Sequence, residues 1–174
     1  MKILDEIKTT NKKPKELISF LTEEIIKDEK LFNQLIEGLI RGSDVVRGIC
    51  AELIKQVTKD KPEYALPYLD IIIENITYKA PRVKWGTAEA IANISQKFPE
   101  KTENAISNLL VNTKDSSTVV RWCAAYALTE IAKNENNLVK RLVPIFKEII
   151  EKEQNNGVKN VYLKALKVIE RNLS

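Results

Sequence analysis

The chain has 174 residues, of which 44% are apolar and 30% charged, and its net charge is +4. This composition is typical of an ordered domain and excludes a disordered tail, and no apolar run is long enough to cross a bilayer. Histidine is absent, so the commonest general base and the commonest metal ligand are both missing. Neither a glycine-rich phosphate loop nor a nucleophile–base pair is present. We therefore expect a cytoplasmic protein that is not an enzyme and holds no cofactor or metal.

The first predicted element is a helix near residues 14–28, where Pro14 suits the first helical turn. After it, one pattern recurs at intervals of 37, 37 and 38 residues. Its four copies open on Val46-Arg47, Val83-Lys84, Val120-Arg121 and Val158-Lys159. A period of this length is the mark of a stacked-repeat protein.

Each copy carries apolar residues at the i, i+3, i+4, i+7 spacing of one helix face. A second apolar stripe precedes each copy, and its members begin at Phe32, Leu69, Ile106 and Leu142. Each repeat is therefore predicted to be a pair of helices, with Asp44 and Ser117 as expected N-caps. We expect one domain over 1–174, made of an N-terminal helix or half repeat over 1–28 and repeats at about 30–58, 63–97, 101–133 and 137–172.

The third copy, with Asp115 before Val120-Arg121 and then the alanine-rich segment 123–128, resembles the HEAT repeat. The resemblance implies an all-α fold, an α-α superhelix (armadillo/HEAT-type solenoid) of about four helix pairs plus an N-terminal half repeat. In that family the first helix of each pair lies on the convex side and the second lines the concave side. The aspartate position holds Arg41 in the first repeat and Tyr78 in the second, so the motif does not predict a continuous aspartate–arginine ladder.

The first candidate site is the basic residue that follows each repeated valine. A row of such residues could bind phosphate or an acidic peptide. Alternatively, the resemblance implies that they tie adjacent repeats together through loop carboxylates and carbonyls. The row consists of Arg47, Lys84, Arg121 and Lys159.

The second candidate lies on the opposite side of the second helices. A 100° step per residue points Trp122 and Tyr126 away from the apolar stripe, and Trp85 takes the position of Trp122 one period earlier. Exposed tryptophans are typical anchors of interfaces. Alternatively, each indole seals the junction between two repeats. The predicted concave-face binding residues are Trp85, Glu89, Trp122, Tyr126 and Lys164.

Lys164, Lys167 and Arg171 share one face of the last helix by their i, i+3, i+7 spacing. They form either a solvated cap of the array or a basic end to the concave groove.

These patterns favour a non-catalytic scaffold or adaptor that recognises a protein or peptide segment on its concave face, as a monomer or as a subunit of a larger complex. The alternative is a nucleic-acid-binding protein, since alkylation-repair DNA glycosylases are similar HEAT-like solenoids. The mild net charge and the acidic Glu52 and Glu89 disfavour that alternative. No membrane partner is expected.

Overall fold

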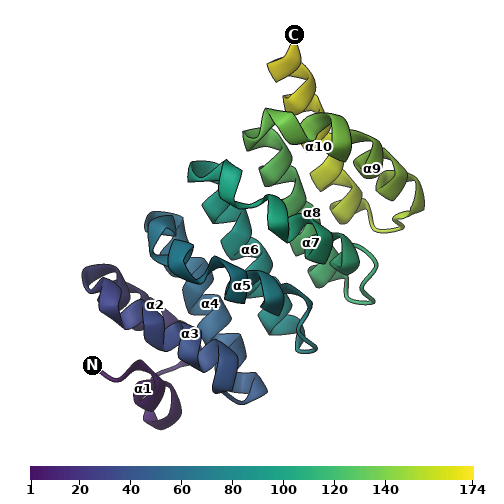
Figure 1. The fold of residues 1–174 in the computed structure, drawn as a ribbon. Helices are drawn as coiled ribbons and strands as arrows, with labels where there is room; N and C mark the ends of the chain where they lie inside the picture. The colour runs from purple at the N-terminus through teal and green to yellow at the C-terminus, as the bar shows by residue number, and fades with distance from the viewer.

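The computed structural model describes residues 1–174, which form ten α-helices and no strand. The helices stack in chain order from the N-terminal to the C-terminal end (Figure 1). Their bounds are α1 (Ile3–Thr9), α2 (Pro14–Lys27), α3 (Phe32–Arg41), α4 (Asp44–Asp60), α5 (Leu69–Glu74), α6 (Pro81–Lys97), α7 (Ile106–Asn112), α8 (Thr118–Asn134), α9 (Val139–Lys152) and α10 (Asn156–Leu173).

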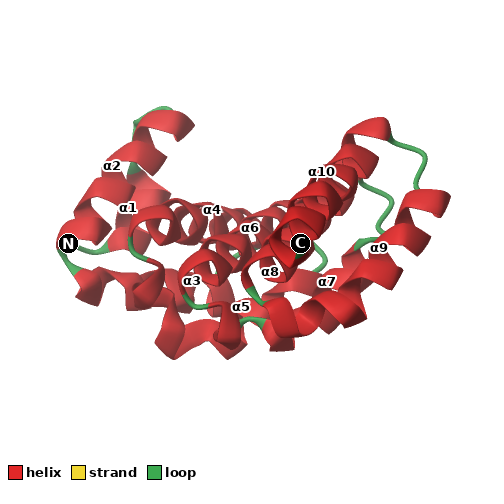
Figure 2. Cartoon of the chain, turned by 90° about the horizontal axis from the view of Figure 1, so that it is seen from above, coloured by secondary structure: helices red, strands yellow, loops and turns green.

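The helices form two layers of a curved array. Figure 2 shows α2, α4, α6, α8 and α10 along the inner, concave side, with α3, α5, α7 and α9 on the outer, convex side. Within the inner layer α4 packs against α6, α6 against α8, and α8 against α10. The expected all-α superhelix of stacked helix pairs is therefore confirmed.

The second helices of the four pairs have nearly equal lengths of 17 or 18 residues, which is about 26 Å of helix. The caps of three of them are polar side chains that accept a backbone N–H in the first turn. The caps are Ser43 of α4, Ser117 of α8 and Asn155 of α10, and each accepts from the backbone N–H of the third residue of its helix. The prediction of Asp44 as a cap was wrong by one residue, because Asp44 already lies inside α4.

The first helices are shorter and less regular, and α5 is the extreme case. Pro67 has no backbone N–H to donate, so an α-helix cannot run through it without losing a hydrogen bond. The chain from Pro62 to Tyr68 instead forms a 3-10 segment, and the α-helix begins only at Leu69. The convex layer is therefore made of rods of unequal length, while the concave layer is uniform.

One hydrophobic core runs through the whole array, from Ile3 to Ile169. Two second helices approach each other closely at Gly86 of α6. A methyl group built there would stand 2.6 Å from the backbone carbonyl carbon and oxygen of Ala51 in α4. A side chain at position 86 would therefore force the two helices apart. No helix of the chain is both long and apolar enough to span a membrane.

Candidate functional site: the concave surface between α8 and α10

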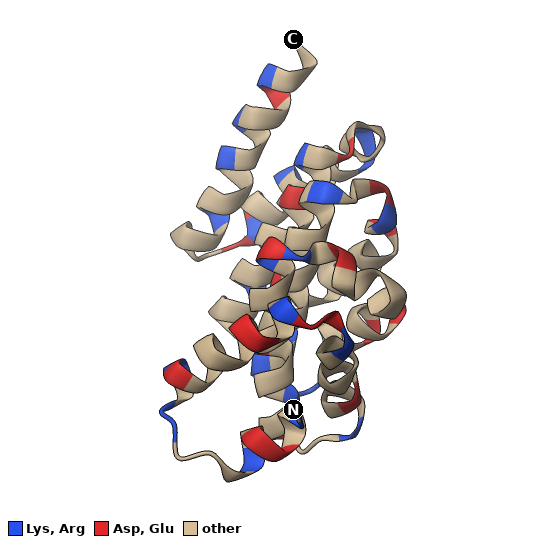
Figure 3. Ribbon diagram, turned by 90° about the vertical axis from the view of Figure 1, so that its left-hand side faces the viewer, with Lys and Arg blue, Asp and Glu red and all other residues tan.

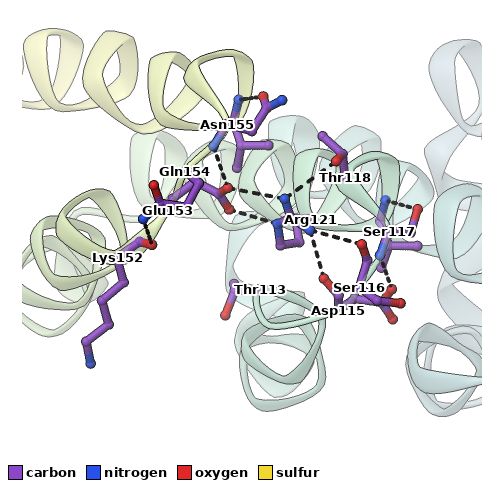
Figure 4. Close-up of polar contacts among 12 residues, drawn as sticks. Thr113, Asp115, Ser116, Ser117, Thr118, Arg121, Lys152, Glu153, Gln154 and Asn155 are labelled. Carbon is purple, nitrogen blue, oxygen red and sulfur yellow. Dashed lines mark hydrogen bonds and ion pairs between the residues drawn. The ribbon is translucent and has the colours of Figure 1, made fainter.

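The loop edge between the last two repeats is organised by Arg121 in the first turn of α8 (Figure 4). Its Nε and Nη2 donate to the two carboxylate oxygens of Glu153 at 2.9 and 3.2 Å. Its Nη1 donates to the carbonyl oxygens of Asp115 and Ser116, and Nη2 also reaches the Thr118 hydroxyl at 3.5 Å. The donors of the guanidinium are thus occupied by the loops on both sides of it.

The same link recurs at the two preceding junctions with different chemistry. Lys84 donates to the carboxylate of Asp115 at 2.6 Å. Arg47 lies over the ring of Tyr78, 4.6 Å from its centroid, and the Tyr78 hydroxyl donates to Asp44 at 2.7 Å. In each case a basic residue of one repeat meets the loop of the next repeat. We call these three links the inter-repeat ladder.

The carboxylates of the ladder are held in their charged form. Burial alone would raise the pKa of Asp115, but the hydrogen bond from Lys84 and one from a backbone N–H outweigh it, and the net pKa is lowered. The pKa of Glu153 is lowered in the same way. Burial would raise this pKa, but the hydrogen bonds from Arg121 outweigh the effect of burial. Both acids therefore remain ionised where the ladder needs them.

Three of the four residues in the predicted basic row thus hold adjacent repeats together. Arg47 also donates to the carbonyls of Leu39 and Gly42, which leaves its guanidinium turned toward its own loop. Lys159 of α10 differs, because it has no carboxylate within ion-pair distance. The row is not brought together as one cationic surface.

Glu153 is a ladder residue that the sequence analysis missed. It lies six residues before Lys159, as Asp115 lies six residues before Arg121. Tyr78 occupies this position in the second repeat and provides an aromatic ring where the motif has an acid. The repeat register alone could have identified Glu153, whereas the contact of Arg47 with the Tyr78 ring is seen only in the structure.

A hollow of about 500 Å³ opens beside the last link of the ladder, between the ends of α7 and α9. Most of the charged groups that face it are paired with each other. Arg121 binds Glu153, and Lys152 donates to Glu148 at 2.6 Å. This hollow is therefore lined by structural ion pairs.

The concave side presents a different surface, centred on Trp122 of α8. Its side chain is 40% exposed, and its ring stacks on Tyr126 with centroids 5.5 Å apart and planes 17° from parallel. A groove of about 300 Å³ separates this Trp122–Tyr126 stack from α10. The α10 side of the groove offers Val161 and Val168, with Lys164 between them in sequence. Apolar side chains on both walls, with Lys164 on the α10 side, thus face the groove.

The structure places Trp85 in a different environment, although it has the same repeat position. Its indole is partly buried and packs against the core, and its Nε1 is buried without a hydrogen-bond partner. The two tryptophans do not stack on one another. Trp85 therefore has the character of a junction residue, and Trp122 that of an exposed platform.

Glu89 also faces its neighbouring helices. It accepts from the Cys123 thiol at 3.4 Å and lies 3.9 Å from Lys55, which pairs with Glu52 at 3.0 Å. This cluster makes the centre of the concave side nearly self-neutralising. Of the five predicted concave-face residues, Trp122, Tyr126 and Lys164 line one groove, whereas Trp85 and Glu89 belong to the middle of the array.

One buried acid underlies the groove. Glu130 is 8% exposed, lies in ion-pair contact with Lys133, and accepts from Gln96 of α6 at 3.1 Å. The pKa of Tyr126 is raised, first by burial and then by the negative charges of Glu130 and Glu89. Tyr126 is therefore a neutral phenol across the physiological range. No group of three or more acidic or cysteine residues is arranged to hold a metal ion.

The sequence and the fold of the chain resemble those of known proteins. No family model matches the sequence. Cullin-associated NEDD8-dissociated protein 1 of Arabidopsis thaliana is 27% identical over 158 residues, which is 82% of this chain and 13% of that protein. The chain thus spans a small part of that relative's length.

Two solved structures have a similar course of the chain. A crystal structure of an engineered protein matches with a TM-score of 0.77 at 20% identity, over 97% of this chain and 80% of the other. A designed armadillo repeat protein in complex with the peptide (KR)4 matches with a TM-score of 0.70 at 17% identity, over 96% of this chain and 80% of the other. At these low sequence identities the similarity shows a shared fold and nothing more.

Proposed function

Because the chain is an α-helical solenoid of the armadillo/HEAT type, we propose that it is a non-catalytic binding scaffold whose concave groove between α8 and α10 recognises a protein or peptide segment. The observation that carries the proposal is the Trp122–Tyr126 stack. An indole that is 40% exposed and held flat against a second ring presents a rigid apolar platform to solvent. Such rings give large contact area at little cost in conformational entropy, which makes them frequent hot spots of interfaces.

The shape of the fold supports the same function. A solenoid builds an extended groove from equivalent positions of successive repeats, and this suits an elongated ligand. A similar designed protein is in complex with a peptide, and the Arabidopsis relative is named for association with cullin. Both support a protein or peptide as the kind of partner. The residues proposed to contact it are Trp122, Tyr126 and Lys164, with Trp85 and Glu89 extending the surface toward the middle of the array.

We expect the Trp122→Ala variant to lose peptide binding while its fold remains intact. A displayed library of random 12-residue peptides is selected on the wild-type protein, and the affinities of single selected peptides are then measured for wild type and variant. Loss of a central interface tryptophan costs about 2 kcal/mol or more, which is about 30-fold in affinity. Since the side chain is exposed, the thermal midpoint should shift by only a few degrees.

The control is Val111→Ala, which removes an exposed apolar side chain from α7 on the convex layer. It should leave every selected peptide bound as tightly as before. Selected peptides that bind the Trp122→Ala variant at wild-type affinity would contradict the proposed binding site.

A further inference from the structure

We infer that the segment bound in this groove is acidic and carries one large apolar side chain. The inference rests on the proposed function and specifies the chemistry of its partner. The geometry that carries it is a row of three unpaired cations, Lys164, Lys167 and Arg171, along α10. The first of them, Lys164, lines the groove beside the Trp122–Tyr126 stack. We call this row the basic end of the concave surface.

The charge of α10 is the most unbalanced among the four second helices. Its sequence from Asn156 to Leu173 holds four basic residues and one acid, Glu170. Blue bands follow one another along α10 in Figure 3, with a single red band near its C-terminal end. The three cations of the basic end have no carboxylate within 4.0 Å, although bases elsewhere on this side, such as Lys55 and Lys133, are paired. The basic end is therefore uncompensated within the chain.

The spacing of these cations sets the size of a matching ligand. Lys164 and Arg171 are separated by seven residues of one helix face, which is about 10 Å. Three carboxylates within a short peptide segment can cover that length. Like charges held together on a surface attract a ligand of opposite sign and accelerate its association.

Next to the cations lies the apolar part of the recognition surface. The groove of about 300 Å³ is walled by the Trp122–Tyr126 stack on one side and by Val161 and Val168 on the other. This volume is at the lower end of the range of ligand pockets and suits one large apolar side chain. An apolar anchor flanked by acids would satisfy both halves of the surface at once.

A peptide fits this charge distribution better than a nucleic acid does. A duplex presents a continuous line of phosphates, so its binding needs a row of cations along the path. Beyond the basic end, the concave surface reaches Glu89 and Glu52, whose two carboxylates pair with Lys55. Phosphates would meet paired carboxylates there and not a continued row of free cations. The (KR)4 peptide of the similar designed protein has the opposite sign to the partner expected here.

The test compares two charge reversals of equal size. The first variant is Lys164→Glu/Lys167→Glu on the basic end, and the control is Lys140→Glu/Lys147→Glu on the convex helix α9, where both lysines are exposed and unpaired. The 12-residue display library is selected separately on wild type and on both variants, in 50 mM salt. Fluorescein-labelled duplex DNA is titrated against the same three proteins.

We expect the wild-type and control pools to be enriched in aspartate and glutamate around an apolar residue, and the Lys164→Glu/Lys167→Glu pool to lose that enrichment. A synthetic peptide from the wild-type pool should bind the first variant at least about tenfold more weakly, and the control within about twofold. Raising the salt to 0.5 M should reduce the difference in peptide affinity between wild type and the first variant, because salt screens exposed charges.

Other outcomes separate this inference from the proposed function. A pool that depends on Trp122 but has no acidic preference would overturn the charge assignment and leave the binding site standing. A pool indifferent to Trp122 would remove the site itself. Duplex DNA that binds tightly and is lost in the Lys164→Glu/Lys167→Glu variant, with no acidic peptides selected, would assign the basic end to nucleic acid instead.

Discussion

The Arg121→Met variant is expected to lose about 3 kcal/mol of unfolding free energy, because removing one partner of a buried ion pair leaves the other charge without compensation. Glu153 has a side chain that is only 5% exposed, and Arg121 itself is 18% exposed. The substitution would also leave the Asp115 and Ser116 carbonyls without their donor. Urea denaturation followed by circular dichroism gives the change.

A matched control exists on the surface. Arg141 and Glu103 form an ion pair at 3.3 Å, but their side chains are 53% and 58% exposed. Such exposed pairs contribute about 0–1 kcal/mol, so Arg141→Met should barely move the urea midpoint. Equal losses in Arg121→Met and Arg141→Met would mean that burial of the ladder has no energetic consequence.

The pH dependence of stability gives a second readout of the same ladder. Because the folded-state pKa values of Asp115 and Glu153 are lowered, their contribution is present above the unfolded-state values near 4. It is lost as the pH falls from about 5 through the folded-state values. Wild type should therefore lose more stability than the Asp115→Asn/Glu153→Gln variant between pH 5 and pH 3.

The Gly86→Ala variant is expected to lose about 2 kcal/mol, although alanine is the better helix former. The added methyl would stand 2.6 Å from backbone atoms of Ala51, which cannot rotate away as a side chain can. Overpacking of this kind costs about 1–3 kcal/mol, and it would spread along the stack because α4 and α6 form the middle of the concave layer. For a chain of this size the thermal midpoint should fall by about 5 °C.

Gly48→Ala is the matched substitution in α4. There the new methyl would meet the Cδ, Cγ and Cβ of Arg82 at 2.9, 3.2 and 3.3 Å. The closest of these atoms belongs to the flexible part of the side chain, which can move. Without a backbone obstacle, the higher helix propensity of alanine should leave stability unchanged or raise it by up to about 1 kcal/mol. If both alanine variants gained stability, the close packing of α4 on α6 would not constrain position 86.

Much of the architecture was accessible from the sequence, because a fixed period ties each local pattern to its equivalents. The apolar stripes around Val83 and Val120 predicted second helices that the structure bounds at Pro81–Lys97 and Thr118–Asn134. The irregular convex layer was harder to predict. Before α5, Pro67 delays the start of the α-helix until Leu69, and the apolar stripe that begins there does not show how far the preceding 3-10 segment extends.

The candidate site was only partly predictable for a physical reason. A helical wheel gives the direction in which Trp85 and Trp122 leave their helices, and it gives them the same direction. Their burial differs because it is decided by the side chains that surround each indole. Trp122 finds Tyr126 four residues on to stack against, while the same position after Trp85 is Glu89, which is engaged with its neighbours. Equivalent repeat positions therefore predict geometry, and the local partners decide exposure.

The most direct test of the binding surface uses the two indole N–H resonances of the chain, since it has only two tryptophans. A ¹⁵N-labelled protein is titrated with a selected peptide, and the Trp122 signal is assigned from the Trp122→Phe variant. Binding in the groove between α8 and α10 predicts that the Trp122 indole and the amides of α10 shift together, while the amides of α5 and α7 on the convex layer stay in place. A peptide that binds with the Trp122 indole unmoved, and with shifts confined to the convex helices, would contradict the account.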